Sequence, residues 1–288
     1  MKFFQIDPRP QGVAVNEQFF AENLEVLGIE VTEQQWANRC SLGNIDHHSP
    51  GDTAETPSAC EQVLEWSNST ILPAMVTVRP DADSITAMAV ITNRLNGRPV
   101  NETVVREVGL RDRLGPAAGK PSAVVVAIAR KAGDFKVTLA DRVAWVADLL
   151  AGVDKSVEVA ALVAATEGEL KAARQASEVS IHADGRIAVV VSTNRFATTL
   201  GYESAPVVIA LNPAMPVDPK DPAKGTVTKF TACRYDSHVK CDLPSALKEL
   251  QALEPGWGGR GDIFGSPQGA SSKLTLEQVV EVVSRHLI

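Results

Sequence analysis

Residues 74–84 read Ala74-Met75-Val76-Thr77-Val78-Arg79-Pro80-Asp81-Ala82-Asp83-Ser84 and carry the strongest fold signal in the chain. The apolar first half of this stretch predicts a buried strand. Ile85, Met88 and Ile91 follow at helical spacing, so the sequence predicts a strand, an acidic turn and a helix. Open α/β sheets place their ligands beyond the carboxyl ends of the strands, which is where Asp81 and Asp83 would lie.

A second polar segment precedes this one and reads Asn44-Ile45-Asp46-His47-His48. Neighbouring side chains on an extended chain point in opposite directions, so one histidine can bind a metal while the other faces a substrate. Taken separately, an Asp-x-Asp pair is typical of a solvated turn, and adjacent histidines are typical of a surface. The chain has only five histidines, and two of them in one acidic tripeptide favour a functional site.

The alternation of strands and helices predicts an α/β fold with a parallel sheet over residues 1–155. The apolar run 123–129 predicts a further strand of that sheet, covered on both faces. Residues 156–180 are rich in Ala, Glu and Lys, which predicts a helical linker. Turn and strand patterns resume after it, so residues 181–288 are expected to form a smaller C-terminal α/β domain.

The net charge of −7 argues against binding of long duplex nucleic acid, because phosphate contacts need basic faces. No apolar run approaches the roughly 20 residues of a membrane span. The apolar segment at the start of the sequence is too short for a signal peptide. The four cysteines form no Cys-x-x-Cys pair, which argues against a zinc ribbon. We therefore expect reduced thiols, a cytoplasmic location and no membrane partner.

Glycines cluster near the C-terminus, from Gly256 to Gly269, between two expected helices. Backbone amides in such a loop can hold an anion, and Arg260 within it could make a bidentate phosphate contact. Arg234, on a preceding strand, is a second candidate for binding phosphate. A glycine-rich loop taken alone is more typical of a flexible surface segment than of an anion site.

Together these residues resemble the DHH phosphoesterase superfamily, which includes single-strand exonucleases, small-nucleotide phosphodiesterases and manganese-dependent pyrophosphatases. The motif that names the family stands here as Asp46-His47-His48, and its carboxylates after a strand match Asp81 and Asp83. The phosphodiesterase branches also carry a C-terminal domain with an arginine on a strand and a glycine-rich loop. Arg234, Gly258, Gly259, Arg260 and Ser266 are the corresponding substrate-binding candidates.

The chain departs from the family pattern in three places. The Asp-x-Asp motif follows Asp46-His47-His48 here, whereas it usually comes first, and this suggests a rearranged sheet connectivity. Thr77 stands where the family often has a metal-binding histidine, which puts one metal site in doubt. Arg260 stands where the family commonly has histidine, which suggests altered substrate recognition.

The resemblance implies two-metal hydrolysis of phosphoesters with Mn²⁺, and Mg²⁺ as an alternative. His47, Asp81 and Asp83 would be metal ligands, while His48 would face the scissile phosphate and Asp46 would orient the imidazoles. An isolated aspartate that bridges the metals would be Asp7, after the first apolar run. The remaining ligands expected by analogy are Asp112 or, in second place, Asp134 or Asp141.

The function expected on this basis is hydrolysis of short single-stranded oligonucleotides or of a small nucleotide phosphodiester. One alternative is a catalytically inactive scaffold that binds nucleotides or a protein partner, which the loss of histidine at Thr77 motivates. Another is a manganese-dependent pyrophosphatase, although the glycine loop favours nucleotide substrates. A homo-oligomer is compatible with the sequence.

Overall fold

A computed structural model describes residues 1–288 with the exception of 49–51, 53–54, 67–73, 219–220, 236–238 and 260. The chain divides into two compact units, Met1–Thr166 and Glu167–Ile288. The division falls inside α8 (Ser156–Gln175), which confirms the predicted long helix. The α/β class, with a parallel sheet in the first unit and a second sheet in the other, is confirmed, while the domain limits at 155 and 181 stay a prediction.

The sheet of the first unit is parallel throughout. Its strands lie side by side in the order β1 (Phe3–Gln5), β4 (Ala74–Thr77), β2 (Val26–Ile29) and β3 (Asn44–Ile45). Every residue of β2 and β4 is buried, as expected for parallel strands with both faces covered. Because the strands are parallel, their carboxyl ends meet at one edge of the sheet, and the loops that leave this edge carry the polar motifs.

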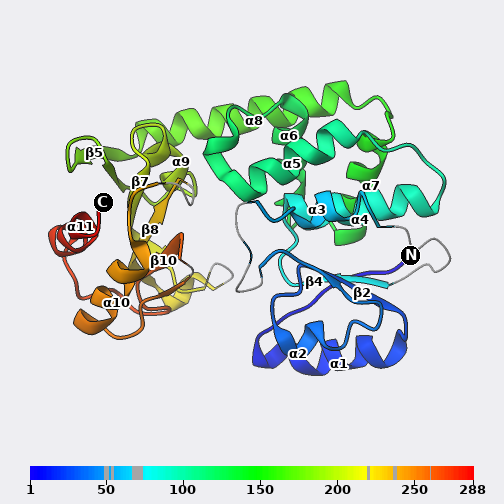
Figure 1. Ribbon diagram of the computed structural model, residues 1–288, viewed down its shortest axis with the longest axis horizontal. Helices are drawn as coiled ribbons and strands as arrows, with labels where there is room; N and C mark the ends of the chain where they lie inside the picture. The colour runs from blue at the N-terminus through cyan, green and yellow to red at the C-terminus, as the bar shows by residue number, and fades with distance from the viewer. Residues whose placement is uncertain (49–51, 53–54, 67–73, 219–220, 236–238, 260) are drawn as a thin grey trace. The chain divides into compact units, whose positions relative to one another are not determined.

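Helices cover both faces of this sheet (Figure 1). One face carries α1 (Val13–Glu22) and α2 (Gln34–Ala37), where the rings of Phe20 and Trp36 stack at 5.9 Å between centroids. The opposite face holds the larger apolar core. The helices that build this core are α3 (Ala59–Gln62), α4 (Ala82–Leu95), α5 (Glu102–Leu114), α6 (Ala123–Ala132) and α7 (Leu139–Leu150). Short 3₁₀ turns precede α1 and follow α5, namely η1 (Pro10–Gly12) and η2 (Gly115–Ala118).

The predicted strand, acidic turn and helix are present as β4, Asp81 and α4. Asp81 is the N-cap of α4, and its Oδ1 accepts a hydrogen bond from the Ser84 amide at 3.0 Å. The Ser84 side chain bonds back to the Asp81 amide, which completes a capping box. The cap begins the helix at Ala82 and therefore puts Asp83 in its first turn, where the side chain is fully buried.

The strand predicted for residues 123–129 is wrong, because this segment lies within α6. An apolar run of this length fits a buried helix as well as a buried strand. Ser122 favours the helix over the strand, because its side chain caps the helix by accepting a hydrogen bond from the Val125 amide. Val125, Ile128 and Ala132 are then buried together in the core at helical spacing.

The second unit contains a mixed sheet whose strand order is β5-β6-β7-β8-β10-β9. Among the described strands of this second sheet, only β6 and β7 pair in parallel, with α9 (Ala197–Tyr202) between them in the chain. The strands are β5 (Glu178–His182), β6 (Ile187–Val191), β7 (Val207–Pro216), β8 (Thr226–Arg234), β9 (Gly258–Gly259) and β10 (Ile263–Gly265). The predicted strands at 187–191 and 207–211 are therefore confirmed.

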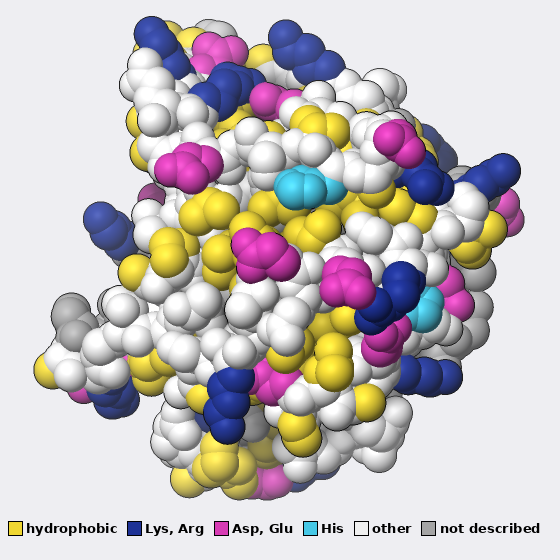
Figure 2. Space-filling model, turned by 90° about the vertical axis from the view of Figure 1, so that its left-hand side faces the viewer, with side chains coloured by type: hydrophobic (Ala, Val, Ile, Leu, Met, Phe, Trp, Pro, Cys, Tyr) yellow, Lys and Arg dark blue, Asp and Glu magenta, His cyan; other side chains and the backbone are white. Residues whose placement is uncertain are grey.

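Helices α10 (Leu243–Leu253) and α11 (Leu276–Arg285) pack on one face of this sheet, and α9 packs on the other. A 3₁₀ turn, η3 (Pro222–Lys224), lies between β7 and β8. On the side of the molecule in Figure 2, acidic, basic and apolar side chains are interspersed at the surface. In the part of the chain that the structure describes, no helix has the length and apolarity needed to cross a membrane.

Candidate metal centre

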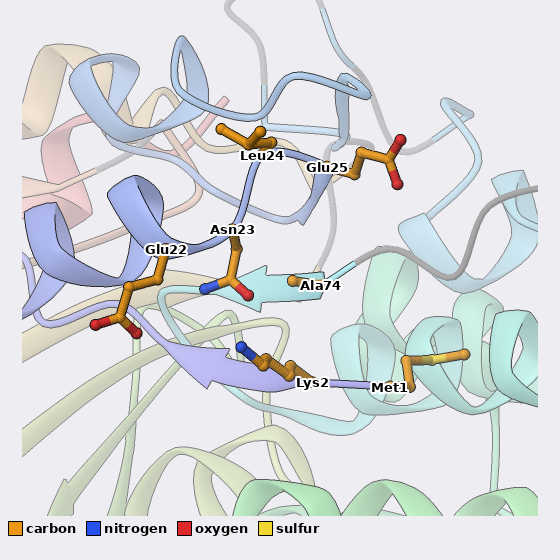
Figure 3. A pocket seen from close by; sticks show the side chains of 7 residues that line it. All are labelled: Met1, Lys2, Glu22, Asn23, Leu24, Glu25 and Ala74. Atoms are coloured by element: carbon orange, nitrogen blue, oxygen red, sulfur yellow. The ribbon is translucent and has the colours of Figure 1, made fainter.

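The two edges of the parallel sheet differ in chemistry. At the amino ends of β1, β2 and β4 a shallow pocket opens (Figure 3). The residues that line it are Met1, Lys2, Glu22, Asn23, Leu24, Glu25 and Ala74. This lining brings together no histidine or aspartate, and we assign it no chemical role.

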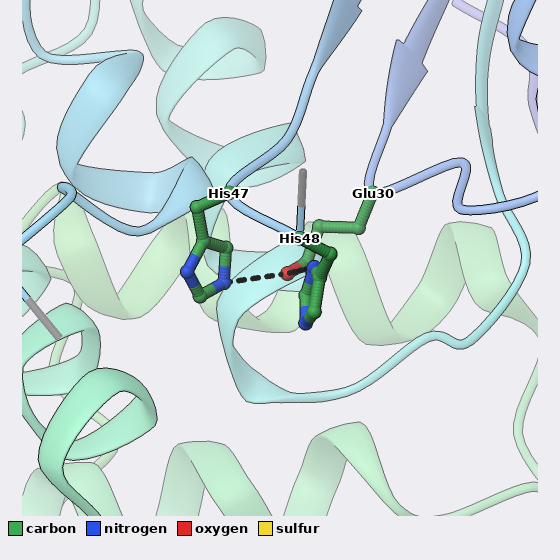
Figure 4. Close-up of side chains that lie close together, drawn as sticks. All are labelled: Glu30, His47 and His48. Atoms are coloured by element: carbon green, nitrogen blue, oxygen red, sulfur yellow. Dashed lines mark hydrogen bonds and ion pairs between the residues drawn. The ribbon is translucent and has the colours of Figure 1, made fainter. Parts of the chain in front are cut away.

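The carboxyl edge carries the candidate site (Figure 4). Glu30 directly follows β2, and His47 and His48 follow β3. Asp83 arrives from the first turn of α4, and Asp112 arrives from α5. Ligand-type atoms of Glu30, His47, Asp83 and Asp112 all lie within 4.8 Å of one another, and Glu30, His47 and His48 form an overlapping group of the same kind.

His47 is the centre of the cluster. Its Nε2 lies 3.1 Å from Glu30 Oε1, 3.0 Å from Asp112 Oδ2 and 3.7 Å from Asp83 Oδ2. Burial lowers the pKa of His47, but hydrogen bonds with Asp112 and Glu30 and the nearby carboxylate charges outweigh it and raise the pKa to about 10. The structure thus brings together His47, Asp83 and Asp112 from among the predicted ligands, and their binding of a metal stays a prediction.

Glu30 belongs to this cluster, although none of the sequence motifs above includes it. Its side chain is only 4% exposed, and its backbone has a φ of +52°, which is uncommon outside glycine. Burial raises the pKa of Glu30 well above its ordinary value, and Asp83, Asp81 and Asp112 add to this effect, while the hydrogen bond with His47 opposes it. The signal in the sequence was an acidic residue at the end of the apolar run Val26–Ile29, the same arrangement that singled out Asp81.

Asp83 is fixed by the N-terminus of α3. Its Oδ1 accepts hydrogen bonds from Ser58 Oγ at 2.8 Å and from the Cys60 amide at 2.9 Å, and its Oδ2 accepts one from the Ala59 amide at 2.8 Å. A carboxylate is the natural partner for the free amides at a helix start. Burial and the charge of Asp112 nevertheless raise the pKa of Asp83. The three hydrogen bonds hold the Asp83 carboxylate in its orientation toward His47.

Asp112 reaches the cluster because α5 packs closely against α3. A Cβ atom at Gly109, which lies one turn before Asp112, would come within 2.5 Å of Ser58 Oγ and of Glu61 Cγ. Arg113 then joins the two helices by pairing with Glu61, with Nε 2.8 Å from Oε2. The small residue and this ion pair hold the Asp112 carboxylate beside His47.

Asp46 organises the two histidines. Its Oδ1 accepts hydrogen bonds from the backbone amides of His47 and His48, at 2.9 and 3.2 Å, and lies 2.8 Å from His48 Nδ1. Burial works against ionisation of Asp46, but the hydrogen bond and charge of His48 and the amide bonds prevail and lower its pKa. The contact with Nδ1 leaves Nε2 as the nitrogen of His48 that can face a ligand.

Two predicted ligands are not in the cluster of described residues. Asp81 is occupied as the cap of α4, although it lies near enough for its charge to raise the pKa of Glu30. Asp7 follows β1, but both of its oxygens face Arg9, with Arg9 Nε and Nη2 each 2.7 Å from a carboxylate oxygen. The role of Asp7 as a bridging ligand gains no support from this arrangement.

The predicted substrate-binding residues of the second unit have structural partners. Arg234 Nη1 donates to the Cys241 carbonyl at 3.1 Å, and buried Ser266 accepts a hydrogen bond from the Phe230 amide at 3.0 Å. Gly258 and Gly259 form β9, where φ of Gly259 is +149° and an added Cβ would lie 2.4 Å from the Ile263 carbonyl. Arg260 lies outside the described residues. Contact of any of these with a substrate stays a prediction.

The donor set fits a divalent cation. Among the residues that the structure describes, histidines are the only groups able to carry positive charge within ion-pair distance of Glu30, Asp83 and Asp112. Burial and neighbouring carboxylates raise the pKa values of Glu30 and Asp83, which favours binding of protons to the cluster unless a cation compensates its charge. Carboxylate oxygens with an imidazole nitrogen suit Mn²⁺ or Mg²⁺, and a bound ion would displace these protons.

The sequence matches no protein-family model and no curated protein. Among solved structures, the chain is similar to a pGpG-specific phosphodiesterase, PggH from Vibrio cholerae, with a TM-score of 0.39, 11% identity and coverage of 74% of this chain and 78% of that one. It is also similar to the DHH domain of a member of a family of ribosomal proteins, with a TM-score of 0.40 and 12% identity. That match covers 96% of this chain and 66% of the other. Both are likenesses of fold alone, so the side chains must carry any statement on activity.

Proposed function

We propose that this protein is a metal-dependent phosphoesterase that hydrolyses short oligonucleotides or a small nucleotide phosphodiester. The observation that carries the proposal is the position of His47 Nε2, which lies within 3.0 to 3.7 Å of the carboxylates of Glu30, Asp83 and Asp112 at the carboxyl edge of a parallel sheet. This edge is where α/β sheets bind ligands.

The four residues of the cluster would hold the metal, which we take to be Mn²⁺, with Mg²⁺ as the alternative. A divalent ion in such a site supplies Lewis acidity toward a phosphoryl oxygen. The chain contributes the rigidity of the site, since the α3 amides hold Asp83 and the close packing of α5 holds Asp112. A second ion remains part of the proposal, with Asp81, whose charge raises the pKa of Glu30, as an additional carboxylate.

His48 would act on the substrate. Asp46 lies 2.8 Å from its Nδ1, which favours the tautomer with a proton on Nδ1 and fixes the orientation of the ring. The His48 side chain is 25% exposed, whereas that of His47 is 9% exposed. His48 can therefore face a substrate phosphate through Nε2, where it would first accept a proton as a general base and then return it as a general acid.

The substrate would be small, because the net charge of −7 disfavours long nucleic acid. The cysteines Cys40, Cys60, Cys233 and Cys241 are all free and buried, which suits a reducing cytoplasm.

The test is turnover on a panel of dinucleotides, cyclic dinucleotides and pyrophosphate with excess Mn²⁺, with metal content measured on each variant. Activity on a nucleotide phosphodiester, lost in His47→Ala together with the metal, is the expected result. In His48→Ala, turnover should fall by about 10²- to 10⁴-fold while the metal content stays near that of the wild type, because this residue acts on the substrate.

The other outcomes separate the alternatives. Hydrolysis of pyrophosphate alone would make the protein a pyrophosphatase. Bound metal without turnover on any member of the panel would favour a nucleotide-binding scaffold. Absence of both metal and turnover would contradict the proposal.

A further inference from the structure

Strand β5 (Glu178–His182) forms an open edge in the sheet of the second unit. It pairs with β6 on one side, and no strand among the described residues pairs with its other side. Val179 and Ile181 on this strand are 45% and 48% exposed. Figure 2 faces the side of the molecule on which Figure 1 places β5, and apolar side chains reach the surface there among charged ones.

The exposed side chains of β5 continue an apolar core. Val179 lies opposite Val190 and Ile181 lies opposite Ala188, so all of these share one face of the sheet. Val190 and Ala188 belong to the core under α9, which packs on β6 and β7. The apolar face therefore extends past α9 to the open edge.

The strand lacks the features that usually protect an open edge. Proteins commonly block such edges with lysine, proline or a bulge. Residues 178–182 contain neither lysine nor proline, and the register between β5 and β6 runs without a shift along the strand. The backbone groups on the outer side of β5 are thus available to a further strand.

The sequence of β5 is complementary to itself in the antiparallel direction. If a two-fold axis passes through Ser180, Glu178 lies opposite His182 of a second copy, and Val179 lies opposite its Ile181. A hydrogen bond between a carboxylate and a facing imidazole, and apolar pairs at facing positions, stabilise antiparallel strands. Moving the axis to Ile181 would instead place Glu178 opposite Asp184, where like charges repel.

We propose that two copies of this chain associate through β5, pairing antiparallel about Ser180 so that the two C-terminal sheets become continuous. A symmetric contact of this kind buries the same surface on both copies. A pair of five-residue strands covers less than the roughly 1,200 Å² of a stable interface. The proposal therefore predicts a reversible dimer that dissociates on dilution. It does not depend on the proposed function.

The first test is sedimentation velocity of the full chain over a range of concentrations from about 1 to 100 µM. Wild type should shift from monomer to dimer, and Ile181→Lys should stay monomeric, because the charge would lie against the apolar Val179 of the second copy. Val157→Lys is the matched control, since Val157 lies on α8 and is 83% exposed. Thermal unfolding of each variant checks that it is folded.

The second test fixes the register. Facing residues in an antiparallel pair have Cα atoms close enough for a disulfide, so Ser180→Cys should cross-link to its own copy under mild oxidation with diamide, two thiols giving one disulfide as diamide is reduced. Glu178→Cys would face position 182 and should cross-link little. The natural cysteines are buried, so wild type supplies the background. A monomer at every concentration, or a dimer that Ile181→Lys leaves intact and Ser180→Cys does not cross-link, would overturn the proposal.

Discussion

His47 Nε2 lies 3.0 Å from Asp112 Oδ2, and this contact joins the loop after β3 to helix α5. The same nitrogen lies 3.1 Å from Glu30 Oε1, at the end of the neighbouring strand β2. The candidate site is therefore assembled from two strand ends and two helices. Substitutions after β2, after β3 and on α5 test the parts of this site separately.

Glu30→Gln should weaken binding of Mn²⁺ by at least about tenfold, because it removes a charged ligand and keeps the shape of the side chain. The metal-free protein should be no less stable than wild type, since the raised pKa of Glu30 already favours its neutral form. Metal titrations and thermal unfolding measure the two effects. Glu25→Gln, at the exposed amino end of the same strand, is the control and should change neither. Unaltered binding in Glu30→Gln would remove Glu30 from the site.

Gly109→Ala should lower both stability and metal affinity. The added Cβ would lie within 2.5 Å of Ser58 Oγ and Glu61 Cγ, so α5 must move away from α3 and take Asp112 with it. We expect a loss of about 1–3 kcal/mol in the free energy of unfolding. Gly168→Ala is the control, since that position in α8 has open space around it and should gain about 0.5–1 kcal/mol. If Gly109→Ala binds Mn²⁺ as tightly as wild type, the packing of α5 does not position Asp112.

The strand, turn and helix from β4 to α4 could be predicted from the sequence, because their signals are local. The buried run ends at Asp81, and Ser84 completes the cap three residues later. The run at 123–129 lacked such a discriminating signal, since β-branched and alanine residues fit both a buried strand and the helix α6 that forms. Ser122, which caps α6, separates the helix from the strand only if this cap signal is considered together with the apolar run.

The candidate site was predictable where motifs point to it and not where sheet order decides it. His47 and Asp83 come together because β3, β2 and β4 are neighbours in the order β1-β4-β2-β3, which no local pattern reveals. Glu30 belongs to the site for the same reason, yet an acidic residue after a strand is common. Asp7 satisfies the same local rule, but the ion pair with Arg9 takes up its carboxylate.

Glu254→Gln should destabilise the second unit in a pH-dependent way. Glu254 accepts hydrogen bonds from Trp257 Nε1 at 2.8 Å, Ser272 Oγ at 2.7 Å and the Lys273 amide at 2.7 Å. Burial opposes ionisation, but these bonds prevail and lower the pKa of Glu254 below its ordinary 4.5. A lowered folded pKa stabilises the protein above the unfolded pKa, and this contribution disappears as the pH falls through the folded pKa.

The measurement is the free energy of unfolding in urea at pH 7 and near pH 3. Wild type should exceed Glu254→Gln by about 1–3 kcal/mol at pH 7, because the amide leaves one donor without an acceptor. The difference should shrink at the lower pH. Glu281→Gln, at an exposed position on α11, should differ from wild type by less than about 0.5 kcal/mol at both. A difference that grows on acidification would contradict the assignment.

The central claim is that His47 and the surrounding carboxylates bind a divalent cation, and calorimetric titration of Mn²⁺ into chelator-treated protein tests it most directly. Wild type should bind at least one ion per chain in a saturable manner, with release of protons that grows as the pH is lowered from about 9 to 7. His47→Ala should lose this binding, while His286→Ala, which removes the partner of Glu249 within the second unit, should retain it. Wild type without saturable binding, or His47→Ala with the affinity of wild type, would contradict the account.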